Sequence, residues 1–292
     1  MKARIVSTVA LLLAATATYA CNGIGTTGDS LVTFPVYAAG AAGASAPFSI
    51  NGYTIELTYA HMYVGAIYVD EAPASSGGTF NTPSCISQGV YCAQVPNGLD
   101  VDLLDTQQQL FPVQGSGSAD VGLSWELYLT QGDVNNPDNS GFGVPDTLDL
   151  IGTATRESDG TVFSWAATVT INASNRGMPS QSPGQPGLDP ICKQRILELA
   201  DISLTLSPGV SMLLTIDPRG WFKLPLDFSS LPSVASSQCQ GDQGSMYGDA
   251  TVCIPDSSNL SGGELGSEQG QTLFDGIFTA GSAAYTLTYL PP

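Results

Sequence analysis

Charged residues are scarce in this sequence, and positively charged residues are the scarcest. Only 12% of the 292 residues are charged, with Lys and Arg numbering 8 against 26 Asp and Glu, so the formal net charge is −18. A typical protein carries about a quarter charged residues, so an ordinary cytosolic helical protein is excluded. An ordinary nucleic-acid-binding protein is excluded because neutralising phosphates requires Lys and Arg. A hydrophobic content of 42% excludes a disordered acidic chain.

Long apolar runs are also absent. No segment reaches the roughly eighteen consecutive apolar residues that a transmembrane helix needs. The longest run, 5–17, follows Lys2 and Arg4, and its thirteen apolar and small residues are typical of the centre of a secretory signal. We therefore expect residues 1–20 to be a signal peptide and the protein to be exported.

The end of this signal, Thr18 to Cys21, resembles that of a bacterial lipoprotein, in which the cysteine becomes the lipidated first residue. On this interpretation Cys21 anchors the protein to a membrane of the cell envelope, and 21–30 is a flexible tether. The same segment also suits an ordinary signal peptidase. In that case the protein is periplasmic or secreted, and Cys21 carries no lipid.

Six cysteines are present, and an exported chain favours disulfides. Six cysteines allow fifteen complete pairings. The two disulfides we expect each close a short loop: Cys85–Cys92 and Cys239–Cys253. Cys192 is then either free or paired with Cys21.

Alternation of apolar and polar residues dominates the chain and predicts half-buried β-strands. It is clearest at 53–59, 162–171 and 285–289, and the first of these is expected to bury Tyr59 along with Tyr53. Asp159-Gly160 is typical of a hairpin turn. Further strands are expected at 31–38, 61–69, 99–104, 123–130, 147–155, 200–206, 210–217, 221–228 and 273–278.

One helix is expected, at 191–200, because Asp189 suits a helix cap and Pro190 a first helical turn. The predicted fold class is therefore all-β, an antiparallel two-sheet β-sandwich with one short helix. Residues 31–292 are expected to form a single domain. Two stretches rich in Ser and Gly predict long loops, 174–190 and 232–271.

Several blocks of this chain resemble, in order and character, the MbnP-like family of periplasmic β-sandwich proteins linked to bacterial copper binding. The blocks are 55–71, 99–105, 149–172 and 210–222. The chain is also similar to uncharacterised bacterial envelope lipoproteins. The resemblance implies a copper-handling role, and that family's sites use His and a Trp-derived group. The only histidine here is His61, beside Met62, and the alternative role for it is a structural hydrogen bond.

An oxygen-rich segment at 133–141 suggests a calcium site. It does not match an EF-hand, because Pro137 and Val144 occupy positions that need oxygen ligands. The alternative is an Asx-rich turn without metal. The candidate ligands are Asp133, Asn135, Asp138 and Asn139.

The few bases are clustered, because five of the eight fall within 48 residues. Four of them are candidates for a basic patch that binds an anion or a partner: Lys193, Arg195, Arg219 and Lys223. The alternative is internal ion pairing, with Arg219 bonded to Asp217 or Asp227.

No catalytic residue is expected. Gly115 to Ser118 is not a nucleophile elbow, and Asp100 and Asp102 share a strand face as neighbouring acids often do. Three tryptophans are candidates for a platform on which sugars stack, but their spacing along the strands fits packing in the core better: Trp125, Trp165 and Trp221. We expect a non-enzymatic binding or structural module of the cell envelope, with or without a bound cation. The alternatives are a carbohydrate- or partner-binding adhesin and a copper-handling accessory protein.

Overall fold

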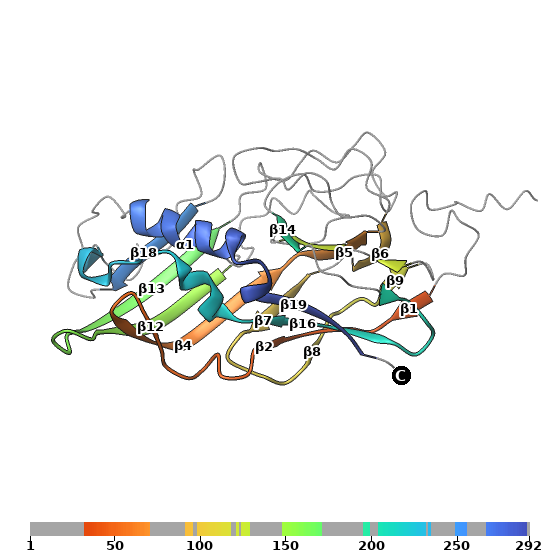
Figure 1. Ribbon diagram of the computed structural model, residues 1–292, viewed down its shortest axis with the longest axis horizontal. Helices are drawn as coiled ribbons and strands as arrows, with labels where there is room; N and C mark the ends of the chain where they lie inside the picture. The colour runs from red at the N-terminus through yellow and green to blue at the C-terminus, as the bar shows by residue number, and fades with distance from the viewer. Residues whose placement is uncertain are drawn as a thin grey trace, which may run out of the picture.

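β-Strands make up most of the described chain, as the alternation predicts (Figure 1). The computed structural model describes residues 32–70, 91–95, 98–117, 121–122, 124–128, 148–170, 195–198, 204–231, 233–234, 249–255 and 267–290. The α-helix within these ranges is α1 (Ser267–Thr279). None of the helices described there is both long and apolar enough to cross a membrane.

The largest sheet contains seven strands and carries the candidate site. In spatial order it runs β17 (Ser233–Val234), β18 (Asp249–Pro255), β13 (Val162–Thr170), β12 (Leu148–Arg156), β4 (Tyr53–Val64) and β3 (Phe48–Ile50), with β7 (Leu99–Asp102) also paired to β4. All pairs are antiparallel except β17 with β18. The long strand β4 is therefore central, with β12 on one side and β3 and β7 on the other.

Three smaller sheets complete the fold. Six strands run β1 (Val32–Phe34), β9 (Gly115–Gly117), β6 (Tyr91–Val95), β5 (Ala66–Asp70), β11 (Ser124–Tyr128) and β14 (Arg195–Glu198). Four run β19 (Tyr285–Leu290), β16 (Ser211–Ile216), β2 (Val36–Gly40) and β8 (Gln109–Leu110), and two form β10 (Val121–Gly122) with β15 (Leu204–Thr205). The all-β, sandwich-like class is confirmed, with the strands divided among more than two sheets.

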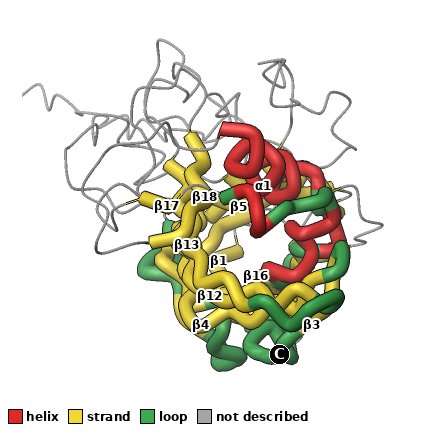
Figure 2. The backbone as a smooth tube through the Cα atoms, turned by 90° about the vertical axis from the view of Figure 1, so that its left-hand side faces the viewer, coloured by secondary structure: helices red, strands yellow, loops and turns green. Residues whose placement is uncertain are grey.

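The core lies between these sheets and a helical side of the molecule. Viewed end-on, β18, β13, β12 and β4 curve round one side, while α1 and the 3-10 helices lie on the other (Figure 2). The 3-10 helices are η2 (Pro218–Lys223), η3 (Phe228–Ser230) and η5 (Gly281–Ala283). Trp165 of β13 packs against Phe222 of η2 and Phe228 of η3, with ring centroids 5.9 and 5.3 Å away.

The three tryptophans belong to this core and form no exposed platform. Trp125, Trp165 and Trp221 are each at most 1% exposed. A sugar platform built from them is therefore wrong, and the core-packing alternative is confirmed.

Several local predictions are wrong where tertiary packing overrides local sequence. The helix expected at 191–200 is replaced at 195–198 by β14, which pairs with β11. The strand expected at 273–278 lies inside α1, where Leu273, Phe274 and Ile277 are buried at helical spacing.

The strand expected at 221–228 is also wrong, because η2 and η3 occupy most of it. Asp217 caps η2 by accepting a hydrogen bond from the Arg219 N–H, and Pro218 fills the first position. The stretch 232–271 is not loop throughout, because it contains β17, β18 and the first turn of α1. The expected signal 1–20, tether 21–30 and loop 174–190 lie outside the described residues.

Candidate binding face on the seven-stranded sheet

Tyr59 lies on the outer face of the seven-stranded sheet, although strict alternation predicts it in the core. The alternate residues before it are buried as expected: Tyr53, Ile55 and Leu57. Tyr59 is 41% exposed, and burial resumes at Ala60. The inward-facing pattern of β4 therefore shifts by one residue between Leu57 and Ala60.

A β-bulge produces this shift. The register of β4 against β12 changes between Ile151 and Gly152, so that Thr58 is an extra residue without a pairing partner on β12. The Thr58 hydroxyl donates to the Ile151 carbonyl oxygen at 3.2 Å. A Cβ atom on Gly152 would lie 2.4 Å from the Glu56 carbonyl oxygen, so the bulge requires glycine there. An isolated glycine inside a strand pattern is the one sequence signal that could have predicted the exposure of Tyr59.

The bulge brings Tyr59 beside His61. Their rings are stacked, with centroids 4.5 Å apart and planes inclined by 16°. The His61 side chain is 28% exposed, and its Nδ1 lies 3.3 Å from Asp100 Oδ1. Met62 points to the opposite face and is fully buried. The two side chains therefore cannot meet at one copper ion, and the hydrogen-bonded role of His61 is confirmed.

Three carboxylates flank the ring pair. Asp102 of β7 and Asp149 of β12 are the residues directly opposite His61 on its two neighbouring strands. Asp100, two residues from Asp102, supplies the contact to the imidazole. The pKa of the Tyr59 hydroxyl is raised, first by partial burial and then by the negative charges of Asp149, Asp100 and Asp102. The exposed rings thus lie in a negative local field.

Two of these carboxylates are fixed by hydrogen bonds from neighbouring elements. The Thr168 hydroxyl of β13 donates to Asp149 Oδ1 at 3.1 Å, and the Leu104 N–H donates to Asp102 Oδ1 at 2.9 Å. The Gln109 side chain also bonds to both backbone groups of Asp102, each at 3.0 Å. Both carboxylates are therefore held in place by hydrogen bonds from the surrounding chain.

Across the residues that the structure describes, no group of three or more His, Cys, Asp or Glu is placed to hold a metal ion. The predicted calcium ligands lie outside the described residues: Asp133, Asn135, Asp138 and Asn139. That site stays a prediction.

The predicted cysteine sites also stay predictions. Cys21, Cys85 and Cys239 lie outside the described residues. Cys92 falls in β6 and Cys253 in β18, but their side chains are not among those described.

The side chains of Arg219 and Lys223 form hydrogen bonds to other residues of the protein. The Arg219 guanidinium forms two hydrogen bonds of 2.7 Å to the Asp217 carboxylate and a third of 3.1 Å to the Ala42 carbonyl oxygen. The pKa of Arg219 is raised, chiefly by the hydrogen bond that it donates to Asp217. Lys223 Nζ donates to the Ala280 carbonyl oxygen at 3.0 Å. These contacts confirm the internal pairing of Arg219 with Asp217.

The basic patch is not assembled as predicted. Lys193 lies outside the described residues, and Arg195 is in β14, with its side chain not described. The 190s helix that was expected to present both bases is a strand at Arg195. Neither Arg219 nor Lys223 is a free surface cation, because both donate hydrogen bonds to the chain.

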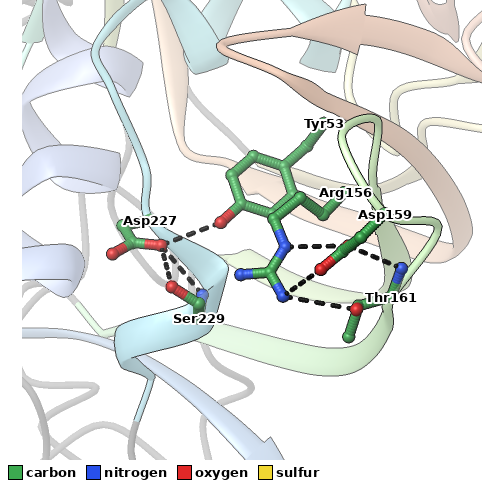
Figure 3. Close-up of polar contacts among 6 residues, drawn as sticks. All are labelled: Tyr53, Arg156, Asp159, Thr161, Asp227 and Ser229. Atoms are coloured by element: carbon green, nitrogen blue, oxygen red, sulfur yellow. Dashed lines mark hydrogen bonds and ion pairs between the residues drawn. The ribbon is translucent and has the colours of Figure 1, made fainter.

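A second polar cluster joins the start of β4 to η3, beside the β12–β13 hairpin turn (Figure 3). The Tyr53 hydroxyl donates to Asp227 Oδ1 at 2.8 Å. The same oxygen accepts from the N–H and the hydroxyl of Ser229, at 3.0 and 2.6 Å. These bonds lower the pKa of Asp227, that from Ser229 most strongly. Asp227 also caps η3, so it has a structural role.

The hairpin turn beside it is closed by an ion pair (Figure 3). Arg156 binds both oxygens of Asp159, at 3.0 and 2.8 Å, and also the Thr161 hydroxyl at 3.2 Å. The hydrogen bond from Arg156 is the largest cause that lowers the pKa of Asp159 to about 2. Gly160 has a φ of +71°, as the predicted Asp-Gly turn requires. This cluster stabilises the turn, so its role is structural. The candidate site is therefore the outer face of β4.

No known family model, curated protein or solved structure matches this chain. The Tyr59–His61 ring pair and its carboxylates are the features of the described chain that bear on function.

Proposed function

We propose that this protein is an exported, non-enzymatic binding module of the bacterial cell envelope. Its binding surface is the outer face of β4, β7 and β12, which we call the β4 face. The observation that carries the proposal is the exposed ring stack of Tyr59 and His61, flanked by Asp100, Asp102 and Asp149. Of the roles considered, it most supports the carbohydrate- or partner-binding alternative.

The apolar part of the β4 face supports a binding role. Tyr59 and Ile151 are directly opposite each other on neighbouring strands and are 41% and 49% exposed. A bulge and a required glycine maintain this exposure, although a regular strand would bury the tyrosine. Aromatic side chains with one exposed face are enriched where proteins bind partners.

The chemistry around His61 favours binding over catalysis. Nucleophilic catalysis needs a base within hydrogen-bonding distance of a nucleophile. Among the described residues, the hydrogen bond of His61 is to the Asp100 carboxylate. A histidine paired with an acid on an open sheet face suits the recognition of polar groups.

Export and anchoring rest on the N-terminal sequence. Two basic residues precede a thirteen-residue apolar run, which ends before Cys21. A tether after Cys21 would hold the domain near the membrane while leaving the β4 face free to bind envelope material.

Two measurements test this proposal on the full-length protein expressed in a bacterial host. In cell fractionation, the wild type is expected with the membranes, and Cys21→Ser is expected in the soluble fraction. In sedimentation with isolated cell envelopes, Tyr59→Leu should weaken binding about tenfold, which corresponds to about 1.4 kcal/mol.

Val162→Ala is the matched control for envelope binding, because Val162 is 59% exposed on β13 of the same sheet, away from the ring pair. It should bind like the wild type. Equal binding by wild type and Tyr59→Leu would refute the β4 face as the binding surface. Unchanged fractionation of Cys21→Ser would refute the lipid anchor.

A further inference from the structure

The negative charge of the β4 face is not balanced by bases on its own strands. The three strands contain one Lys or Arg among them, Arg156 at the end of β12. Arg156 is bound to Asp159 and lies beside Tyr53, at the opposite end of the pairing from His61. A ligand on this face therefore meets carboxylates without a competing cation from these strands.

An aromatic face next to carboxylates is the arrangement that recognises an ammonium group. A cation is attracted to the face of an aromatic ring, by about 0.5–1 kcal/mol at exposed sites and more when water is displaced. Here the Tyr59 ring is backed by His61, Asp100 contacts the imidazole, and Asp102 and Asp149 are opposite His61 on the neighbouring strands. The formal net charge of −18 adds a long-range attraction for cations.

Hydroxyl side chains continue the face away from the ring pair. Across β4, β12 and β13, Glu56 is opposite Thr153, and Thr153 is opposite Ser164. All three lie on the outer face, with Glu56 and Ser164 exposed and Thr153 partly exposed. Asp149 and Thr153 are four residues apart on β12, about 13 Å along a strand. The face therefore offers hydrogen-bonding groups over more than one sugar ring.

The backbone of β4 is not available to a peptide partner at this point. Around His61 it is paired with β12 on one side and β7 on the other. A peptide that binds by adding a strand needs a free sheet edge. A ligand of the β4 face must instead be recognised by side chains alone, through a flat ring, hydroxyls and charge.

Building on the proposed function, we propose that the β4 face binds a polysaccharide that carries free amino groups. A sugar ring stacks on Tyr59, its ammonium group lies among Asp100, Asp102 and Asp149, and its hydroxyls reach the Glu56–Thr153–Ser164 row. Acetylation of the amine removes its positive charge, so an N-acetylated sugar should lose the preferential binding to the β4 face.

Calorimetric titration of the full-length protein with two oligosaccharides of the same length tests the proposal. One probe is an oligomer of glucosamine, and the other is the same oligomer fully N-acetylated. The glucosamine oligomer is expected to bind at least tenfold more tightly, and its binding should weaken at high salt because the charges are exposed.

Two variants that remove the same charge separate the β4 face from the overall acidity of the protein. Asp100→Asn should weaken binding of the glucosamine oligomer at least fivefold, and its side chain is 56% exposed, so folding should be retained. Glu157→Gln, in the exposed hairpin turn at the other end of the sheet, should change binding less than twofold. Equal losses in the two variants would overturn the proposal.

Three further outcomes would overturn the proposal. Equal affinity for both oligosaccharides would exclude recognition of the ammonium group. If Tyr59→Leu then lost the binding of both oligosaccharides, the β4 face would still be the binding surface. Binding of neither oligosaccharide, with envelope binding still dependent on Tyr59, would also refute the amino sugar and keep the proposed function. Tighter binding of oligolysine in competition with glucosamine would identify a basic protein as the partner.

Discussion

Gly152 is the residue on which the exposure of Tyr59 depends, and Gly152→Ala is the most direct perturbation of the site. A new Cβ would lie 2.4 Å from the Glu56 carbonyl oxygen. Because that oxygen belongs to the backbone of a central strand, it cannot move away as the end of a flexible side chain can. Either β4 and β12 separate locally, or the bulge at Thr58 is lost.

Two opposing contributions determine how much Gly152→Ala changes the free energy of unfolding. Replacing glycine by alanine in a strand gains about 0.5–1 kcal/mol, because glycine loses more conformational freedom on folding. Forcing an extra carbon into a packed site costs about 1–3 kcal/mol. The clash is severe and wholly against backbone, so we expect the cost to prevail, with a net loss of about 1–2 kcal/mol in the free energy of unfolding.

Thermal and urea unfolding followed by circular dichroism measure this loss. For a protein of this size, about 1–2 kcal/mol lowers the Tm by about 2–8 °C. Thr153→Ala, which removes a partly exposed hydroxyl at the next position, is the control and should leave the Tm nearly unchanged. Gly152→Ala should also weaken binding at the β4 face. A Tm equal to or above that of the wild type would refute the requirement for glycine.

Three other perturbations give independent tests. The lowered pKa of Asp159 means that its stabilisation is present above the unfolded value of about 4 and is lost as the pH falls through about 2, and the lowered pKa of Asp227 acts in the same direction; Asp159→Asn should flatten this acid dependence in unfolding curves, and an unchanged slope would contradict it. Trp165→Ala should cost about 3–5 kcal/mol by leaving a cavity, whereas Trp165→Phe should cost far less, because the buried indole N–H has no hydrogen-bond partner to lose; equal melting temperatures for the two variants would refute this difference. Arg219→Lys should lose the two-point contact with Asp217 and about 1 kcal/mol of stability, and a Tm identical to the wild type would show that the pair contributes nothing.

The sequence predicts the strands well wherever one face is buried and the other is polar. The hairpin of β12 and β13 is an example, since Trp165, Ala167 and Val169 are all buried and the turn falls at Asp159-Gly160. Local alternation is sufficient there because regular pairing preserves it.

The errors occur where a contact distant in sequence decides the local structure. Gly276 of α1 lies so close to the Trp221 carbonyl oxygen that a Cβ would be 2.0 Å from it, a contact across 55 positions that no local pattern contains. Asp217-Pro218, by contrast, is a helix-start signal that was present in the sequence and predicts η2 once it is given its usual weight.

The candidate site could be predicted only in part. Asp100 and Asp102 are predictably on one strand face, and His61 is predictably a hydrogen-bonded histidine. Their association with Tyr59 and Asp149 was hidden, because it depends on the bulge at Thr58 and on the pairing of β4 with both β7 and β12. Strand order and bulges are set by the whole sheet, so a single sequence indicates them only weakly.

The four-stranded sheet constrains when this protein can fold. Its strand β16 pairs on one side with β2, from near the start of the described chain, and on the other with β19, which ends at Leu290 (Figure 1). The parallel pairing of Val36 with Met212 must wait until the long segment between them has been synthesised, and β19 can join the sheet only after that. A chain emerging from the ribosome therefore cannot close this sheet early. For the export that we propose, this late closure would leave the completion of the fold to the far side of the membrane.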